Sequence, residues 1–344
     1  MNDQKGSADP ASSMPRLPWS APVAAVAAPA PPALNLDQAA DRITISGGGF
    51  GVAVDRKTGL LVSLKSGDTE LLDAPLHPHF WRAPVDNDRG NNMPNSDKAN
   101  SWNPGMGLWR HAHETWELRS IGVTQDNPGR VTVAVEGKIR EPGCVQRIIW
   151  TILGTGDVLV ATTLHPGDGP VPELPRFGMQ TTLRAGFDQL AWYGKGPQET
   201  YWDRQDARVG IYRGKVKDQY FDYIMPQETG NKEGVRWLAL TNPAGRGLLA
   251  VGQPLLSANA LPYTTEDLFC ATQKENFYRY LLPERDTVTL NLDLKQRGLG
   301  GDNSWGAVPH EAFRLDVWPI SYRYRLKVLQ GGEDPIVLAK QVVE

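Results

Sequence analysis

Residues 80–90 combine side chains that are suited to holding a sugar. The segment reads Phe-Trp-Arg-Ala-Pro-Val-Asp-Asn-Asp-Arg-Gly. Aromatic rings stack on the apolar face of a pyranose, while Asp, Asn and Arg supply directional hydrogen bonds to its hydroxyls. This mixture predicts an irregular loop rather than a regular helix or strand. Its candidate sugar ligands are Trp81, Arg82, Asp86, Asn87 and Asp88, and the alternative for its aromatic rings is a place in the core.

Three later segments have the same polar, glycine-bearing composition. They are residues 193–199 (Tyr-Gly-Lys-Gly-Pro-Gln-Glu), 226–231 (Pro-Gln-Glu-Thr-Gly-Asn) and 298–305 (Gly-Leu-Gly-Gly-Asp-Asn-Ser-Trp). Together with the first segment, they predict a single shared site or interface. In the last segment the glycines allow a sharp backbone turn, which would project the rigid indole of Trp305 outward.

The carboxylates on these segments could be catalytic if the segments converge. A retaining glycosidase needs two carboxyl groups about 5–5.5 Å apart, one with a raised pKa, and an inverting one needs about 6.5–9.5 Å. The candidates are Asp86, Asp88, Glu199, Glu228 and Asp302. The alternative is a structural role. Glu199 and Asp203 would then form an ion-pair network with Arg204, and Glu228 would pair with Arg236.

The sequence indicates no metal site. Residues 86–88 (Asp-Asn-Asp) have the composition of a calcium loop, but no glutamate closes a twelve-residue loop. His111 and His113 alone are too few ligands for zinc. We therefore expect neither a metal nor a cofactor in this chain. Cys144 and Cys270 are expected to be separate reduced thiols, with a disulfide as the alternative.

The elements that would position these segments are short strands. From Ile43 onward, apolar runs, several with period-two alternation, are separated by glycine, proline and asparagine. Residues 56–59 and 154–157 read as hairpin turns. Residues 266–273 are typical of one short helix. So many strands with so little helix predict an all-β fold, a large antiparallel β-supersandwich of two packed sheets.

Length and composition fit one such domain, residues 42–344, preceded by a linker. The 344 residues carry a net charge of -3 with dispersed Lys and Arg, so neither nucleic acid nor a membrane is expected as a partner. Residues 1–41 are rich in Ala and Pro and predict a disordered linker. The sequence has no signal-peptide pattern and no apolar run of eighteen residues, which favours a cytoplasmic location.

The four segments, in this order, resemble the C-terminal domain of glycoside hydrolase family 2 β-galactosidases, which some bacteria encode as a separate small subunit. The resemblance runs from about Ile43 to the C-terminus. It implies a galactose-mutarotase-like supersandwich and a role in hydrolysing β-galactosides such as lactose. In that family the acid/base and nucleophile glutamates, and the magnesium beside them, lie on a TIM barrel. The 344 residues contain no such barrel.

The resemblance also assigns roles to single residues. Trp305 corresponds to a tryptophan that reaches into the barrel's active site as an aromatic platform, and we expect Asp302 and Asn303 beside it to contact the sugar. Gly90 would be the hinge of a mobile loop. The chain departs from its relatives at Gln273, where they commonly have histidine. This departure weighs against mutarotase activity.

Three functions remain open on the sequence. The first is a β-galactosidase component that completes the sugar site with its loops, with a large catalytic subunit or a homo-oligomer as its partner. The second is a self-sufficient glycosidase that uses its own loop carboxylates. The third is a non-catalytic carbohydrate-binding module. Hydrolysis by the purified chain alone would separate the second function from the other two.

Overall fold

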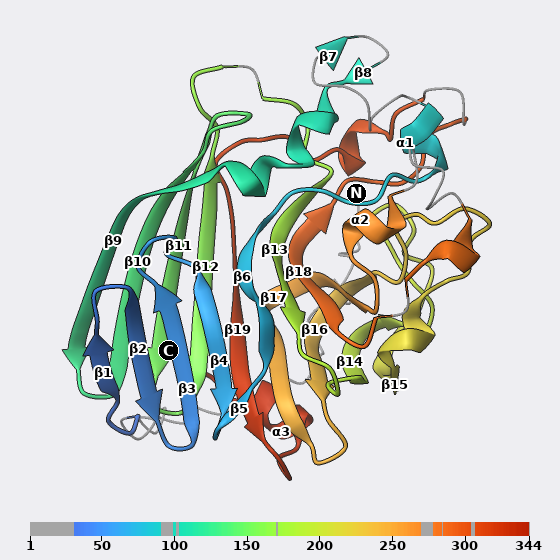
Figure 1. Ribbon diagram of the computed structural model, residues 1–344. Coiled ribbons are helices and arrows are strands. Elements are labelled where there is room, and N and C mark those ends of the chain that lie inside the picture. The colour runs from blue at the N-terminus through green and yellow to red at the C-terminus, as the bar shows by residue number, and fades with distance from the viewer. Residues whose placement is uncertain are drawn as a thin grey trace, which may run out of the picture. The chain divides into compact units, whose positions relative to one another are not determined.

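A computed structural model describes residues 31–90, 99–100, 103–169, 171–269, 278–283, 285–303 and 307–343. Antiparallel strands dominate these residues (Figure 1). The strands are β1 (Asn35–Gln38), β2 (Arg42–Gly47), β3 (Phe50–Asp55), β4 (Leu61–Ser66), β5 (Thr69–Glu70), β6 (Leu72–His79), β7 (Ala99–Asn100), β8 (Asn103–Pro104), β9 (Trp116–Asn127), β10 (Arg130–Ile139), β11 (Cys144–Leu153), β12 (Asp157–His165), β13 (Arg176–Leu183), β14 (Gln189–Gly196), β15 (Arg208–Lys215), β16 (Lys232–Thr241), β17 (Arg246–Leu261), β18 (Val288–Gln296) and β19 (Ile320–Gln330). The helices are α1 (Asp86–Gly90), α2 (Thr265–Leu268) and α3 (Pro335–Ala339), and the 3₁₀ turns are η3 (Met106–Trp109), η4 (Ala112–Thr115), η5 (Val216–Gln219), η7 (Arg279–Leu281) and η8 (Glu311–Phe313).

Apart from β7 and β8, which pair with each other, the strands build one large sheet that curls into two layers (Figure 1). One layer runs β1–β2–β3–β4–β6–β13–β18, and the other runs β9–β10–β11–β12–β19. The long strand β17 joins them, because its residues 246–253 pair with β19 and its residues 257–261 pair with β18. Strands β16, β14 and β15 extend the sheet beyond β17. The predicted all-β antiparallel supersandwich is confirmed.

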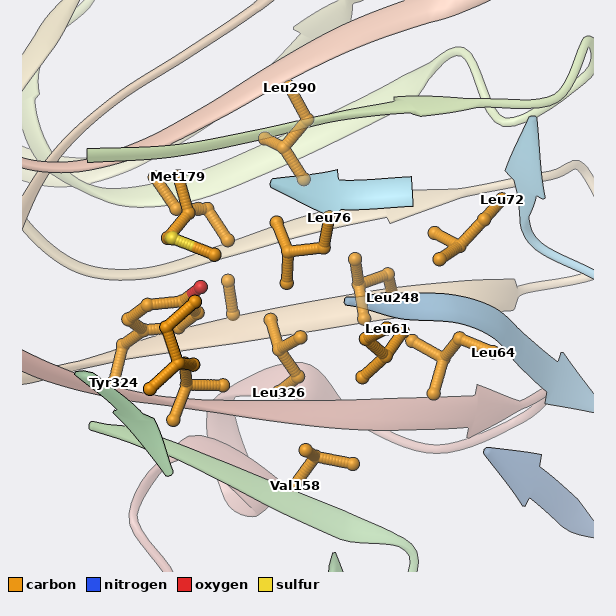
Figure 2. Packing of buried hydrophobic residues seen from close by; sticks show 14 of the residues in the cluster. Leu61, Leu64, Leu72, Leu76, Val158, Met179, Leu248, Leu290, Tyr324 and Leu326 are labelled. Carbon is orange, nitrogen blue, oxygen red and sulfur yellow. The ribbon is translucent and has the colours of Figure 1, made fainter. Parts of the chain in front are cut away.

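The main core lies between the layers, because the strands turn alternate apolar side chains inward. In β10, Val131, Val133 and Val135 are buried, and the residues between them are not. Figure 2 shows side chains of both layers in one cluster, among them Leu64 from β4 and Leu326 from β19. Burying each such side chain stabilises the fold by about 1.5–3 kcal/mol. A one-residue register slip would therefore expose the core face of a strand.

The sandwich begins earlier than the predicted boundary at residue 42. Strand β1 pairs with β2 and places Leu36 opposite Ile45. The amide of Leu34 donates a hydrogen bond to the carbonyl of Pro128 at 2.7 Å. Residues 35–38 thus belong to the sheet and not to a linker. Residues 1–30 of the predicted linker lie outside the described residues.

The segment 80–90 is more regular than its composition predicts, because its end forms the short helix α1. The Asp88 carboxylate accepts the amide of Val85 at 3.1 Å, and the amide of Arg89 donates to the carbonyl of Val85 at 3.0 Å. These two bonds close a helical turn. Asp86 and Asp88 also place negative charge in the first turn, where the helix dipole favours it.

Helix α2 occupies the start of the segment that was predicted to be helical. Thr264 and Asp267 form a capping box: the Thr264 hydroxyl accepts the Asp267 amide at 3.1 Å, and the Asp267 carboxylate accepts the Thr264 amide at 2.8 Å. Residues 270–273 of the predicted helix lie outside the described residues. No helix in the described part of the chain is long and apolar enough to cross a membrane.

Of Cys144, Cys270 and Gln273, the structure describes only Cys144. Cys144 is a buried free thiol, as expected, and burial raises its pKa to about 11. Cys270 and Gln273 lie outside the described residues. The expectation of a reduced thiol is thus confirmed for Cys144 and stays a prediction for Cys270.

Candidate functional site

The four polar segments meet in one loop cluster, which we define as residues 80–90, 193–206, 226–231 and 297–303. Arg82 ties the first segment to the fourth, because its guanidinium donates to the carbonyls of Arg297 and Gly298, the latter at 3.0 Å. The side-chain amide of Asn87 donates to the carbonyl of Leu299 at 3.2 Å. Two loops that are 216 residues apart at the Arg82–Gly298 contact are thus held side by side.

The first segment also holds the third. The amide of Glu228 donates to the carbonyl of Ala83 at 3.2 Å. Arg89 reaches across from α1 and donates from Nη2 to the carbonyl of Pro226 at 2.9 Å. One backbone hydrogen bond and one long arginine side chain thus connect the first segment to the third.

The second segment completes the cluster. Asp203 Oδ2 accepts the amide of Gly300 at 2.7 Å, and Glu199 Oε2 accepts the amide of Gly230 at 2.7 Å. The predicted convergence of the four segments is confirmed. A Cβ added at residue 298 would lie 2.8 Å from the Asp203 carboxylate, so the close approach of these loops requires a glycine at that position.

Arg82 and Asp88 are buried against each other. Arg82 Nη2 lies 3.0 Å from Asp88 Oδ1, and Arg82 Nε donates to Asp88 Oδ2 at 3.2 Å. Arg297 Nη1 approaches the same carboxylate at 3.7 Å, while Arg297 Nε pairs with Glu173 at 2.8 Å. Burial lowers the pKa of Arg297, and its two acidic partners oppose this shift. Direct contact of Arg82 or Asp88 with a sugar stays a prediction, and in this structure both hold loops.

The aromatic residues of the first segment belong to the core. Phe80 and Trp81 are each 1% exposed. The Phe80 ring lies 5.2 Å from that of Trp109, and Trp81 meets Phe269 edge-on at 6.4 Å between ring centroids. Burying an aromatic ring removes a large apolar area from water. Trp81 therefore anchors the segment, and neither face of its indole is open to a ligand in this position.

Three sugar-contact candidates face solvent. The side chains of Asp86 and Asp302 are 73% and 80% exposed, and Asn303 is exposed beside Asp302. Each acid has a basic neighbour, since Arg89 lies 3.3 Å from Asp86 and His310 lies 2.8 Å from Asp302. Both carboxylates are open to water, where an ion pair contributes little free energy. Their carboxylates are therefore accessible to a sugar hydroxyl.

The remaining candidates are placed less directly. Asn87 is partly buried, with its amide engaged by the fourth segment. Gly90 ends helix α1, and its hinge role stays a prediction. Trp305 lies outside the described residues, so the aromatic platform expected there also stays a prediction.

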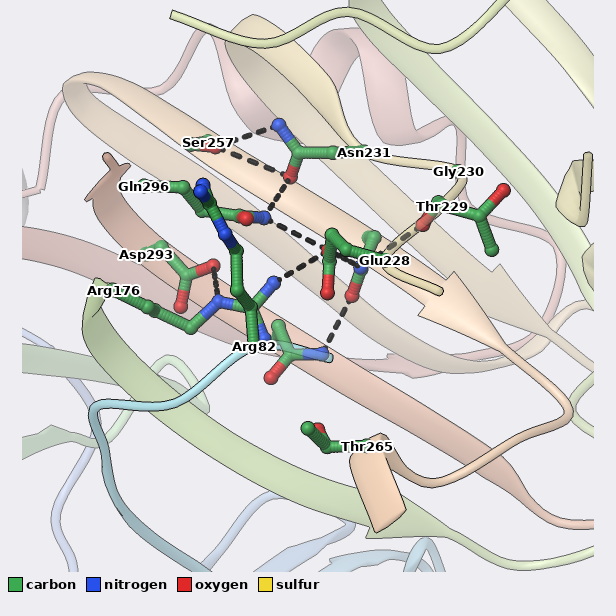
Figure 3. Close-up of polar contacts among 12 residues, drawn as sticks. Arg82, Arg176, Glu228, Thr229, Gly230, Asn231, Ser257, Thr265, Asp293 and Gln296 are labelled. Carbon is green, nitrogen blue, oxygen red and sulfur yellow. Dashed lines mark hydrogen bonds and ion pairs between the residues drawn. The ribbon is translucent and has the colours of Figure 1, made fainter. Parts of the chain in front are cut away.

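A buried polar network centred on Arg176 joins the loop cluster through Glu228 (Figure 3). Arg176 Nη2 pairs with Glu228 Oε1 at 2.8 Å, and Arg176 Nε pairs with Asp293 Oδ2 at 3.0 Å. The predicted pair of Glu228 with Arg236 is wrong, because Arg236 instead donates to the carbonyl of Gly234 at 2.7 Å. The partner of Glu228 comes from strand β13, 52 residues earlier in the chain.

A row of amides continues this network across neighbouring strands. Asn259 of β17 donates to Glu228 Oε1 at 3.1 Å and accepts Asn291 Nδ2 of β18 at 2.6 Å. Asn291 in turn accepts Gln180 Nε2 of β13 at 2.9 Å, and the Gln180 amide lies beside His79 of β6. The sequence reasoning missed this row. Its signal was present, since β18 places Asn291 and Asp293 two residues apart among apolar neighbours.

Burial shifts the protonation of two acids in the network. The pKa of Asp293 is raised to about 8 by burial, although Arg176 pulls it down. The pKa of Glu233 is raised to about 7 by burial, although hydrogen bonds from Ser257 and Asn231 oppose the shift. Both acids therefore hold a proton at or near neutral pH.

Glu199 is the centre of a second polar group. It pairs with Arg204, as predicted, and accepts the hydroxyl of Tyr223 and that of Thr229, the last at 3.1 Å. Asp203 differs from the prediction, because its described hydrogen bond comes from the backbone of the fourth segment and not from Arg204. Glu199 thus fixes the second and third segments, with its carboxylate largely buried.

The five candidate carboxylates do not form a pair that faces a shared opening. Asp88, Glu199 and Glu228 are buried and hydrogen-bonded. Asp86 and Asp302 are exposed and stand singly. In a glycosidase, both carboxyl groups must reach the scissile bond. As placed here, these acids can orient a ligand or hold a loop, but they do not supply an acid and a nucleophile together.

A cavity beside Glu199 is small. It measures about 90 Å³ and is lined in part by Gln198 and Lys232, whereas small-molecule sites usually measure ~300–1,000 Å³. Two larger hollows, of about 520 and 620 Å³, are lined in part by α3. Within the ranges that the structure describes, no group of three or more His, Cys, Asp or Glu side chains could hold a metal ion.

The fold and the loop cluster define the class of protein, an antiparallel β-supersandwich that gathers four polar loops into one place. The family model described as "Beta galactosidase small chain" matches residues 46–327. The chain therefore belongs to the β-galactosidase small chain family.

Its curated relatives include proteins named β-galactosidase. One from Priestia megaterium is 37% identical over 300 residues, which cover 87% of this chain and 27% of the relative. One from Halalkalibacterium halodurans is 33% identical and covers 79% of this chain and 26% of its own length. The chain thus spans about a quarter of the length of these relatives. A solved galactose 1-epimerase from Lactobacillus acidophilus covers 86% of this chain and 97% of its own, at 9% identity and a TM-score of 0.47.

Proposed function

We propose that this chain is a β-galactosidase component that completes the sugar site with its loop cluster. The catalytic glutamates would come from a TIM barrel outside these 344 residues, on a large catalytic subunit. The observation that carries this proposal is how the acids of the loop cluster are buried and paired. The buried ones are committed to holding loops, and the exposed ones, Asp86 and Asp302, stand singly. Such a domain can orient a sugar, but it needs catalytic acids from elsewhere.

The substrate that we propose is a terminal β-galactoside such as lactose. Asp86, Asp302 and Asn303 would bind sugar hydroxyls, and Trp305 would supply a stacking platform. The buried side chain of Arg82 would keep these loops together. Magnesium would belong to the barrel, and we propose no cofactor for this chain. A cytoplasmic location is part of the same proposal.

A complementation assay tests this function. The probe is the Priestia megaterium enzyme deleted for the region that aligns with this chain. We expect the mixture of this probe and the full chain to hydrolyse a chromogenic β-galactoside, and neither protein alone to do so. Asp302→Ala should lower kcat/KM of the mixture by about tenfold or more, as loss of a charged hydrogen bond does. The control is Asp73→Ala, an exposed acid on β6. Equal activity of both variants would contradict the role of Asp302.

A second candidate is a self-sufficient glycosidase, and one observation favours it. Glu228 and Asp293 share Arg176, and the pKa of Asp293, near 8, would let it act as a general acid at neutral pH. Both acids are buried, so the strands would have to open to admit a sugar. Turnover by the chain alone that Asp293→Asn abolishes would favour this candidate. Sugar binding without turnover in either assay would favour a carbohydrate-binding module instead.

A further inference from the structure

Large apolar side chains are exposed beside the loop cluster. Five of them define what we call the apolar patch: Phe221 (56% exposed), Ile224 (91%), Tyr278 (49%), Tyr280 (76%) and Leu281 (44%). Folded proteins expose such side chains singly, and a group of them marks a contact surface. The patch is therefore a candidate interface.

The patch comes from two parts of the chain that an ion pair holds together. Asp222 and Arg279 form an ion pair between the loop 221–224 and the turn 278–281. This pair places the two apolar segments next to each other. Both charged side chains are about half exposed, and the pair leaves the patch with no net charge from these two residues.

Local contacts hold the patch in a defined shape. The amide of Phe221 donates to the hydroxyl of Thr229 at 3.0 Å. The Phe221 and Tyr223 rings lie 4.6 Å apart, and the Tyr278 and Tyr280 rings stack 5.4 Å apart with only 10° between their planes. A surface that is already ordered loses little conformational entropy when it binds.

The patch also borders the loop cluster. Tyr223, which packs on Phe221, donates its hydroxyl to Glu199 of the second segment. Residues 221–225 lead directly into the third segment, where Arg89 of α1 donates to the carbonyl of Pro226. A protein that approaches the loop cluster closely would therefore cover the patch as well.

We propose that the apolar patch is the surface against which the catalytic part of the β-galactosidase packs. This inference rests on the proposed function. The relatives are about four times as long as the region that they share with this chain, so most of such an enzyme lies outside it. That part must come close to the loop cluster to share a sugar site. The neighbouring patch supplies the apolar area that a stable contact requires.

Binding to the shortened Priestia megaterium enzyme tests the patch. The proteins are the wild-type chain, the double variant Ile224→Asp/Tyr280→Asp, and the control Val342→Asp, which changes an 83% exposed apolar residue outside the patch. Sedimentation velocity measures Kd, and circular dichroism checks folding. We expect the double variant to raise Kd by about thirtyfold or more, as loss of a central apolar contact does. The control should bind as the wild type does.

The outcomes separate this inference from the proposed function. If the double variant binds within twofold of the control while the wild-type chain restores activity, the patch is not the interface and the proposed function stands. If the wild-type chain neither binds the shortened enzyme nor restores its activity, both fail. Self-association of the wild-type chain that the double variant abolishes would assign the patch to a second copy, and this would also overturn the inference.

Discussion

At the scale of residues, Arg176 is the most consequential side chain of the buried network. It is fully buried and paired with Glu228 and Asp293. Asp293 holds a proton at neutral pH, so the charge of Arg176 mainly compensates Glu228. Removing one partner of a buried ion pair leaves the other charged, without water and without compensation.

We therefore expect Arg176→Met to lower the free energy of unfolding by about 3–5 kcal/mol. Urea denaturation followed by tryptophan fluorescence measures this loss. The matched control is Arg147→Met, since Arg147 pairs with Glu136 on the surface, is 62% exposed, and should cost under about 1 kcal/mol. Equal losses in the two variants would contradict the structural role of Arg176.

A histidine group predicts acid sensitivity. The His77 and His113 rings stack 5.1 Å apart with His79 beside them. Burial lowers the pKa of all three, that of His77 to about 4. Between pH 6.5 and 4 these histidines bind more protons in the unfolded chain than in the folded protein, so the stability that they contribute falls as pH falls through this window. In His77→Gln the free energy of unfolding should fall less steeply with pH, by the slope that about one bound proton contributes. Urea denaturation at pH 6.5, 5.5 and 4.5 measures the free energy of unfolding of both proteins. A constant difference between wild type and variant over these pH values would contradict this prediction.

Asp293 predicts the opposite pH dependence. Its folded pKa of about 8 lies above the ordinary value of 3.8, so the folded protein binds the extra proton between these values. The stability that this proton contributes is lost as pH rises through about 8. Asp293→Asn cannot ionise, so the wild type should lose stability relative to the variant between pH 5 and 9. Urea denaturation of both proteins across this range measures the difference between their free energies of unfolding. A difference that stays constant with pH would contradict the prediction.

The residue-level errors of the sequence reasoning have physical causes. Glu228 pairs with Arg176 instead of nearby Arg236, because strand register and not proximity along the chain decides which buried groups meet. For Trp81 the sequence left a sugar platform and a core position open, and the area that the ring removes from water favours burial. Neither outcome can be derived until the packing of β13, β17 and β18 is known.

At the scale of elements, loop-to-loop tethers give the cluster its shape. The contact between Asp203 and the amide of Gly300 attaches the fourth segment, which carries Asp302 and leads to Trp305. The carboxylate accepts a charge-assisted bond from a backbone amide, which is stronger than a neutral one. Precise placement of the exposed acid thus depends on a side chain from another segment.

Asp203→Ala should therefore loosen the fourth segment. We expect the amide of Gly300 to exchange hydrogen at least tenfold faster, because it loses its acceptor, while the free energy of unfolding falls by only about 1–3 kcal/mol. Hydrogen exchange followed by mass spectrometry measures this change. Asp206→Ala, at an exposed acid nearby, is the control. Unchanged exchange at Gly300 in the Asp203 variant would show that other contacts hold the segment.

The sequence pattern predicts most strands, because period-two alternation reflects which face is buried. It missed β1, whose residues Asn35–Gln38 include one apolar side chain, because backbone pairing with β2 and not alternation holds this strand. It also missed α1, which depends on the capping carboxylate of Asp88. Local hydrogen bonds of this kind leave little trace in hydrophobicity.

At the scale of the whole molecule, the curled sheet explains why distant segments meet. Strand β13 pairs with both β6 and β18, so it brings the first segment, which follows β6, next to the fourth segment, which follows β18. The composition of the four segments predicted this convergence, and the family resemblance indicated that the site serves β-galactoside hydrolysis. The result is a loop cluster that exposes Asp86, Asp302 and Asn303 but holds, within the described residues, no pair of acids that faces a shared opening.

The most direct test is hydrolysis of a chromogenic β-galactoside by the rigorously purified full chain alone. We expect no turnover above the uncatalysed rate, because the five candidate carboxylates are either buried and hydrogen-bonded or stand without a second acid beside them. Turnover that follows the amount of this chain, and that Asp293→Asn or Glu228→Gln abolishes without unfolding it, would contradict the account. It would mean that the sandwich carries its own catalytic acids.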